Sequence, residues 1–195
     1  MADLYTDMLS NPAAFLDASY DAGFQLSQSQ REAIYLRGLQ KRFSELSPKI
    51  STLKTLAKEQ GVTEIKTIDD AVPLLFPHTV YKSYPLSLLE KGRFDRLTKW
   101  LSGLTSTDLS AVDTTGVDTI DDWIALLEKT TELQVLHTFG TSGKLSFVPR
   151  SRHQWTQTVK LTAHCLRDWS GAATGPDVLH HHLPMVIPSY RHGAS

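Results

Sequence analysis

The stretch from Leu133 to Ser151, LQVLHTFGTSGKLSFVPRS, places the strongest constraint on how this chain can fold. Apolar residues alternate with other residues on both sides of its centre, which predicts two strands. Between them, residues 138–144 carry three hydroxyls, two glycines and one lysine. Glycines let a backbone approach a ligand closely, and consecutive N–H groups beside hydroxyls and an ammonium suit a polyphosphate. The stretch therefore predicts a strand, a nucleotide-binding loop and a second strand.

The composition is that of a globular chain. Its 195 residues are 41% hydrophobic and 21% charged, enough for one domain or two small ones. The 20 basic and 21 acidic residues give a net charge of −1, which provides no general attraction for nucleic acid or for an anionic membrane. Cys165 is the only cysteine, so an intramolecular disulfide is impossible and a reducing compartment fits.

The N-terminus lacks the basic and apolar regions of a secretory signal, and the apolar runs are too short for a membrane span. We therefore expect a cytoplasmic protein that binds no nucleic acid and does not cross a membrane.

Residues 1–130 predict a helical N-terminal region. Caps, prolines and apolar spacing predict helices after Asn11-Pro12, from Ser27 or Ser29 to Pro48, from Pro48 to Gly61, from Pro85 to Glu90, from Phe94 to Gly103, and from Thr119 onward. Thr119 and Asp122 form an approximate capping box, and Trp123 within the apolar stripe is expected in the core. Three prolines between residues 62 and 118 predict a broken segment.

Residues 131–195 predict the start of an α/β nucleotide-binding domain. After the two strands, Ser151 and Gln154 form a capping box for a long amphipathic helix, and residues 178–187 predict another strand. Three consecutive histidines, His180 to His182, cannot all point to one side of a strand, so a metal site is not expected there.

Two well-known phosphate-binding motifs do not fit the loop. A Walker A loop needs four residues between its glycines and a Ser or Thr after the lysine, whereas here two residues separate Gly140 from Gly143 and Leu145 follows Lys144. A dinucleotide-binding turn opens directly into a helix, whereas this loop opens into the extended segment 145–148.

The loop resembles the phosphate-binding loop of the adenylate-forming superfamily, whose pattern is Thr/Ser-Ser/Gly-Gly-Thr/Ser-Thr/Ser-Gly-x-Pro-Lys. The matching residues are Thr138, Gly140, Thr141, Ser142, Gly143 and Lys144. Phe139 and Leu145 depart from the pattern. The continuation through residues 146–149 is similar to the phenylacetate–CoA ligase and luminescence acyl-protein synthetase branch. A looser likeness at residues 183–193 implies that His192 contacts the acyl substrate.

This resemblance implies an α/β fold in which a helical N-terminal region precedes the first strands and helix of a large, here incomplete, adenylate-forming domain. It implies ATP and Mg²⁺ as cofactors, a fatty or aryl carboxylic acid as substrate, and CoA or a protein thiol as acyl acceptor. The loop would hold the β- and γ-phosphates, and Lys144 would neutralise charge as pyrophosphate leaves.

The family's magnesium ligand and catalytic residues have no counterpart in these 195 residues, so no catalytic residue is assigned. The chain alone is expected to be inactive.

A second hypothesis stays open on the residues alone. Glycine and serine turns between strands are common, so the chain can also be a non-catalytic α/β interaction module with a glycine-rich hairpin turn. The ordered run from Thr138 to Lys144 and the segment 147–149 favour the ligase.

Overall fold

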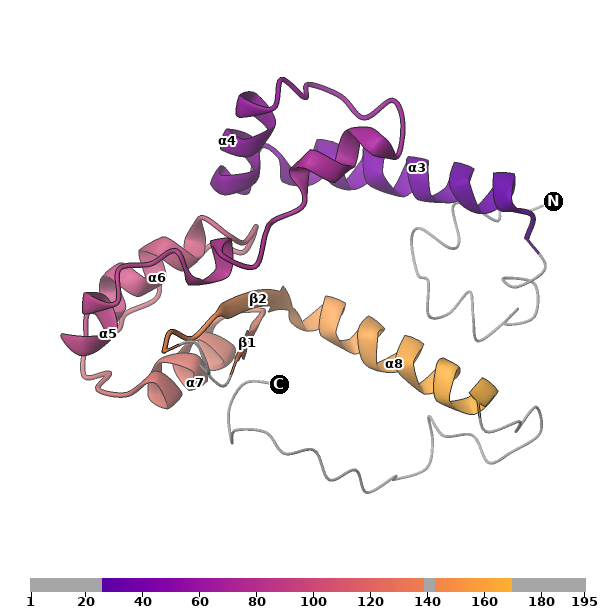
Figure 1. The fold of residues 1–195 in the computed structure, drawn as a ribbon. Helices are drawn as coiled ribbons and strands as arrows, with labels where there is room; N and C mark the ends of the chain where they lie inside the picture. The colour runs from indigo at the N-terminus through magenta and orange to yellow at the C-terminus, as the bar shows by residue number, and fades with distance from the viewer. Residues whose placement is uncertain (1–25, 139–142, 170–195) are drawn as a thin grey trace. The chain divides into compact units, whose positions relative to one another are not determined.

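The computed structural model of the chain describes residues 26–138 and 143–169, with side chains to residue 162 (Figure 1). Its elements in order are α3 (Gln28–Leu46), α4 (Ser51–Glu59), the 3-10 helices η1 (Asp69–Leu74) and η2 (Val80–Lys82), α5 (Ser87–Glu90), α6 (Phe94–Ser102), α7 (Ile120–Thr130), β1 (Leu133–His137), β2 (Phe147–Ser151) and α8 (Arg152–Trp169). The general prediction of a mixed α and β chain is confirmed.

The described residues divide into two compact units. One contains residues 26–38 and 153–169, and the other contains residues 39–138 and 143–152. The domain boundary predicted at residue 130 stays a prediction. Within the second unit, however, α7 packs on β1 across that position.

The helix ends agree with the capping signals of the sequence. At the start of α3, the Ser27 N–H donates to Gln30 Oε1 (2.8 Å) and the Gln30 N–H donates to Ser27 Oγ (3.3 Å). At the start of α7, the Asp122 N–H donates to Thr119 Oγ1 (3.1 Å) and the Thr119 hydroxyl donates to Asp122 Oδ2 (2.6 Å). Gly61 follows α4 with a φ of 67°. Side-chain oxygens thus satisfy amide donors that a helix leaves unpaired at its first turn.

The two strands form an antiparallel pair in which Leu133 faces Ser151 and His137 faces Phe147. Every second residue of β1 is buried, as the alternation predicts. Helices α6 and α7 and the strands share one hydrophobic cluster, which consists of Tyr84, Phe94, Leu97, Leu101, Leu109, Trp123, Ile124, Leu127, Leu133, Val135 and Phe147. Trp123 is fully buried in this cluster, which confirms its prediction as a core residue.

The second strand begins later and runs further than the sequence predicts. The expected segment was 145–148, whereas β2 covers Phe147–Ser151. Pro149 lies within this strand, opposite Val135. A proline is tolerated there because each strand of a two-stranded sheet has a free edge, and an N–H group missing on that edge removes no hydrogen bond between the strands. Helix α8 follows at Arg152, directly after the predicted cap Ser151.

Several predictions lie outside the described residues. They concern the helix after Asn11, the strand at 178–187 and the histidine run His180 to His182. None of the helices in the described ranges combines the length and the apolar character needed to cross a bilayer.

Candidate functional site

The two stems of the predicted phosphate-binding loop are held together at Thr138 and Ser146. The Thr138 N–H donates to the Ser146 carbonyl (3.2 Å), which extends the β1–β2 ladder by one pair. The Ser146 N–H donates to Thr138 Oγ1 (3.1 Å). Thr138 is exposed, and its hydroxyl proton has no acceptor within the described ranges. The hydroxyl therefore links the two stems as an acceptor, and it donates to no residue in the described part of the chain.

Gly143 adopts a backbone conformation that favours glycine. Its φ is 78°, and a Cβ at this position would meet no atom within 4 Å among the described residues. The requirement for glycine is thus conformational, because other residues are strained at positive φ even where space is free. The second stem thus begins at Gly143, which is in the left-handed conformation and has open space where a side chain would be.

Lys144 and Leu145 are both fastened to Tyr84, which lies 60 residues earlier. The Lys144 ammonium donates a hydrogen bond to the Tyr84 carbonyl and lies 4.4 Å from the centroid of the Tyr84 ring. The Tyr84 hydroxyl donates to the Leu145 carbonyl (2.8 Å). A cation over an aromatic face is attracted by the negative face of the ring. Tyr84 therefore fixes the second stem by three separate contacts.

Tyr84 can act as a fixed anchor because it belongs to the core. Its side chain is fully buried, with the ring centroid 5.0 Å from that of Trp100 and 5.5 Å from that of Phe147. Burial raises the pKa of its hydroxyl to about 12, so the hydroxyl stays a donor at physiological pH.

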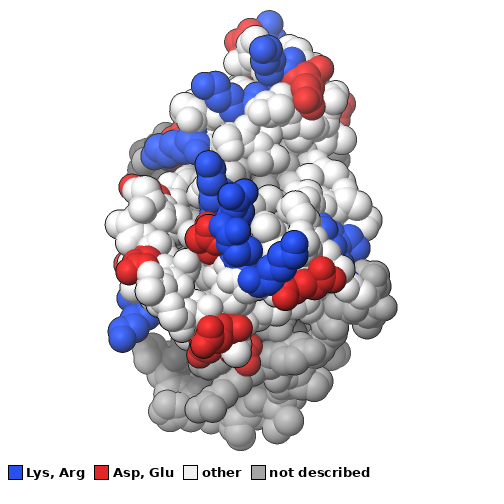
Figure 2. All heavy atoms as spheres, turned by 90° about the vertical axis from the view of Figure 1, so that its left-hand side faces the viewer, with Lys and Arg blue, Asp and Glu red and all other residues white. Residues whose placement is uncertain are grey.

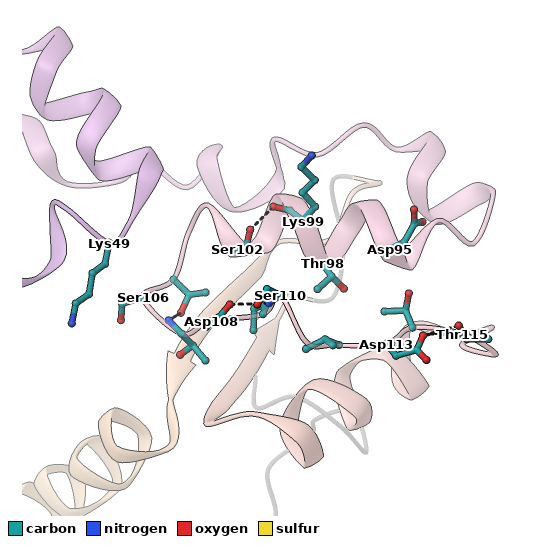
Figure 3. A pocket seen from close by; sticks show the side chains of 15 residues that line it. Lys49, Asp95, Thr98, Lys99, Ser102, Ser106, Asp108, Ser110, Asp113 and Thr115 are labelled. Carbon is teal, nitrogen blue, oxygen red and sulfur yellow. Dashed lines mark hydrogen bonds between the residues drawn. The ribbon is translucent and has the colours of Figure 1, made fainter.

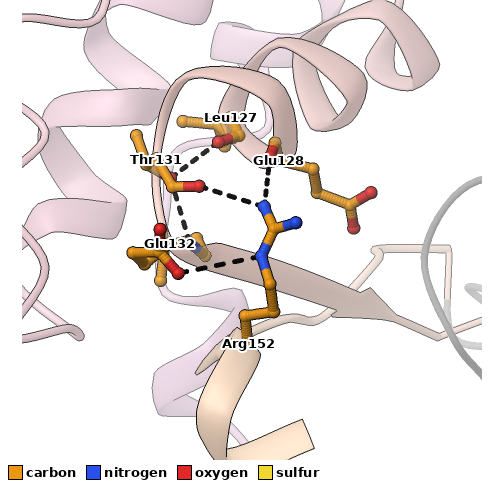
Figure 4. A network of polar contacts seen from close by, with 6 residues as sticks. Leu127, Glu128, Thr131, Glu132 and Arg152 are labelled. Atoms are coloured by element: carbon orange, nitrogen blue, oxygen red, sulfur yellow. Dashed lines mark hydrogen bonds and ion pairs between the residues drawn. The ribbon is translucent and has the colours of Figure 1, made fainter. Parts of the chain in front are cut away.

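The other end of the hairpin is fastened by Arg152, as Figure 4 shows. Its guanidinium donates to the carbonyls of Glu128 (2.9 Å) and Thr131 (3.4 Å) at the C-terminal end of α7. Its backbone N–H donates to the Glu132 carbonyl (2.7 Å), and its Nε lies 3.7 Å from a Glu132 carboxylate oxygen. A cation near the last carbonyls of a helix is favourable because of the helix dipole. The hairpin is thus tied to the core at both ends.

The structure brings Thr138, Gly143 and Lys144 to the base of one hairpin loop. Gly140, Thr141, Ser142 and the departing residue Phe139 lie outside the described residues, as does His192. Tyr84 was not singled out by sequence reasoning. Its only local signal is an aromatic residue directly before Pro85 in a proline-broken segment, and no spacing rule relates that position to a loop 60 residues away.

A metal site is not identified in the described part of the chain. Within residues 26–138 and 143–162, no group of three His, Cys, Asp or Glu side chains is arranged to hold an ion. The magnesium that the resemblance implies therefore has no ligand set among these residues, and no chemical step is derived from it.

A polar cavity of about 820 Å³ lies elsewhere in the same unit, between α6 and the segment 105–115 (Figure 3). Its two carboxylates on that segment accept hydrogen bonds from their own turns: Asp108 from the Ser110 N–H, and Asp113 from the hydroxyl and N–H of Thr115. These bonds hold the pKa of both carboxyls below the usual value. None of the lining residues belongs to the loop, so the cavity is separate from the predicted phosphate site.

No protein-family model, curated protein or solved structure matches this chain. The case for a function therefore rests on the residues themselves and on the geometry of the hairpin.

Proposed function

We propose that the chain supplies the phosphate-binding loop of an ATP-dependent ligase that activates a carboxylic acid as its acyl-adenylate. A carboxylate oxygen of a fatty or aryl acid attacks the α-phosphorus of ATP, and pyrophosphate leaves. The acyl group then passes to CoA or to a protein thiol. Residues 138–144 would hold the β- and γ-phosphates during the first step, so their role is positioning and charge stabilisation.

The observation that carries this proposal is the construction of the loop's two stems. The first stem presents the exposed Thr138 hydroxyl, which accepts from the Ser146 N–H and donates to no residue among 26–138 and 143–162. The second stem presents Gly143 in a left-handed conformation with open space where a side chain would be. Phosphate-binding loops present backbone N–H groups to the anion, and an exposed hydroxyl beside a glycine without a side chain leaves such a backbone accessible.

Lys144 adds a positive charge beside these stems. Its ammonium has a neutral partner, the Tyr84 carbonyl, which a phosphate oxygen can replace. The bond to the carbonyl already has an ionised donor, and a phosphate oxygen adds the attraction of an opposite charge, so exchange from the carbonyl to a phosphate is favourable. In this proposal Lys144 moves from Tyr84 to the departing pyrophosphate.

The proposal is tested by replacing Gly143 with valine and comparing it with the same change at Gly116. Both glycines have nearly equal φ values, 78° and 76°, and a Cβ added at either position would meet no described atom within 4 Å. Both variants should therefore lose similar stability. Only Gly143→Val should lower ATP affinity, by about tenfold or more, because roughly 1–3 kcal/mol of backbone strain would distort the bound loop. Calorimetric titration of the chain with ATP measures the affinity.

The adenylation step itself is tested by ATP–pyrophosphate exchange on the natural full-length protein with a panel of fatty and aryl acids. Exchange that depends on one class of acid and disappears in Gly143→Val supports the ligase. Equal ATP affinity of the wild type and Gly143→Val would remove the loop from nucleotide binding.

One observation favours the alternative of a non-catalytic module with a hairpin turn. The strands pair antiparallel, and Lys144 is satisfied within the fold by Tyr84. In that case Lys144→Met lowers stability and has no effect on ATP, whereas the ligase predicts weaker ATP binding as well. The same titration, with thermal unfolding alongside it, separates the two functions.

A further inference from the structure

Helix α6 lines a groove of about 610 Å³, and none of residues 138–144 belongs to its lining. Its lining residues are Pro85, Leu88, Asp95, Arg96, Lys99 and Trp100. The set combines an apolar floor with two cations and one carboxylate. Nothing in the proposed ATP chemistry uses these residues.

The two cations of the groove form no ion pair in the described part of the chain, although Arg96 lies close enough to Asp95 to help Arg93 hold the pKa of that carboxyl below its usual value. Arg96 and Lys99 are exposed, and neither forms an ion pair or a side-chain hydrogen bond with residues 26–138 or 143–162. The carboxylate of Asp95 is already engaged by the Arg93 guanidinium, with distances of 2.9 and 3.0 Å. That contact keeps the pKa of Asp95 below its usual value, so the carboxylate stays ionised and paired.

The positive charge extends beyond the groove. Residues 82–99 contain five Lys and Arg against two Asp and Glu, although the whole chain has a net charge of only −1. Figure 2 shows Lys and Arg side chains in a run across one face, with acidic side chains to either side. A local field of one sign attracts a partner of the opposite sign and fixes its orientation.

The apolar floor of the groove is held by contacts with the core. The Trp100 indole N–H donates to Ser83 Oγ (2.9 Å), and the ring lies edge-on to Tyr84. Leu88 and Trp100 are half-buried and pack against the core cluster. Leu86, next to this floor in the chain, remains 43% exposed. A fixed aromatic floor that is half open to solvent is typical of the anchor positions in protein interfaces.

We propose that this groove is a docking surface for a short acidic segment of a protein partner, anchored by an apolar side chain on Trp100 and Leu88. Acidic side chains of the segment pair with Arg96 and Lys99. A free phosphate would leave the apolar floor unused, and a flat bilayer would not fill a concave groove. This docking surface does not depend on ATP binding by the loop, because the groove and the loop share no residue.

The test uses the full chain and fluorescein-labelled peptides of about twelve residues. One peptide contains several Glu and a pair of Leu, the second has Gln in place of Glu, and the third has Ala in place of Leu. Fluorescence anisotropy should show binding of the first peptide, with affinities about tenfold lower for each of the others. Raising the salt from about 0.02 M to about 0.3 M should weaken the first complex, because screening shortens the reach of the charges.

Charge reversal locates the peptide on the protein. Arg96→Glu combined with Lys99→Glu should weaken binding of the acidic peptide by about tenfold or more. Lys54→Glu combined with Lys58→Glu makes the same change in net charge at two exposed positions of α4 and should leave the affinity within about twofold. All four residues are exposed, and unchanged near-ultraviolet circular dichroism would confirm that each variant is folded.

Three outcomes would overturn the proposal. The first is equal binding of the Glu and Gln peptides. The second is equal loss of affinity in the α4 control variant. The third is binding to vesicles with about one-third phosphatidylserine, or to an oligonucleotide, in the absence of peptide binding. That result would assign the basic face to a membrane or to nucleic acid.

Discussion

Tyr84 connects the core to the loop stem through both its backbone and its side chain. The hydroxyl holds the Leu145 carbonyl, while the carbonyl and ring hold the Lys144 ammonium. Because the ring also packs on Phe147 in β2, the residue contacts the hairpin at successive positions. Loss of the hydroxyl alone removes one of these contacts and leaves the packing intact.

Tyr84→Phe should therefore destabilise the protein by about 1–3 kcal/mol at neutral pH, since a buried carbonyl loses its donor. The wild type should also lose about 2 kcal/mol between pH 10 and pH 12, and the variant should lose correspondingly less. The free energy of unfolding falls with pH because burial raises the pKa of Tyr84 in the folded protein to about 12, whereas an unfolded tyrosine ionises near pH 10. Above pH 10, ionisation therefore stabilises the unfolded state. Urea unfolding at several pH values measures both effects, and parallel pH profiles of the two proteins would contradict them.

At the scale of elements, α7 is the helix whose start is most directly encoded. Its cap, Thr119, both accepts from the Asp122 N–H and donates to the Asp122 carboxylate. The apolar residues that follow at helical spacing, Trp123, Ile124 and Leu127, are all fully buried. The cap thus sets where the helix begins, and the apolar spacing sets which face is buried, so that local sequence and tertiary packing agree.

Removal of this cap gives a prediction with a matched control. Thr119→Ala should reduce the free energy of unfolding by about 1 kcal/mol, because the Asp122 N–H loses its partner. Thr55→Ala, at an exposed position of α4, should change it by no more than about 0.5 kcal/mol. Chemical denaturation of both variants measures the difference, and equal stabilities would show that the cap contributes nothing.

The helices and strands that could be predicted are those whose sequence signals lie within a few residues of the element itself. Helix caps, prolines and alternation predicted where α3, α7 and α8 begin, and they predicted that two strands exist, although β2 begins at Phe147 and not at residue 145. The 3-10 helices η1 and η2 fall in the segment that three prolines marked only as broken, because proline excludes long helices without specifying what replaces them.

The contacts that frame the loop could not be predicted in this way. Tyr84 reaches Lys144 and Leu145 across 60 and 61 residues, and the Arg152 guanidinium reaches Glu128 across 24. Such long-range contacts depend on how the whole unit packs, and they leave no pattern of periodicity or spacing in the sequence. The glycine at 143 was recognised from its loop, but its positive φ is a property of the folded backbone.

At the scale of the whole molecule, the core cluster joins α6, α7 and both strands into one unit. Phe147 is fully buried, and its ring lies edge-on to Trp123 with the centroids 5.2 Å apart. Since Trp123 also donates to Thr98 on α6 (2.8 Å), these three residues connect the sheet to both helices. Unfolding of the hairpin and of these helices should therefore be cooperative.

Phe147→Ala should lower the free energy of unfolding by about 3–5 kcal/mol, because it leaves a cavity in a closely packed core. In a background with Trp155→Phe and Trp169→Phe, the remaining tryptophans Trp100 and Trp123 both belong to the residues 39–152 unit, and their fluorescence should share one midpoint with the far-ultraviolet circular dichroism. Val72→Ala, where the side chain is 58% exposed, should shift that midpoint little. Separate midpoints for the two probes in this background would show that hairpin and helices unfold independently.

The contact between Lys144 and Tyr84 also bears on the thermodynamics of any anion that the loop binds. A lysine side chain that is free in solution loses about 2 kcal/mol of rotamer entropy when a ligand immobilises it. Lys144 has already lost much of that freedom on folding, because a carbonyl and an aromatic ring hold its ammonium. An incoming phosphate therefore exchanges one acceptor for another on an ordered side chain. The entropic cost of recruiting this lysine is small, and its enthalpic contribution is the difference between two hydrogen bonds.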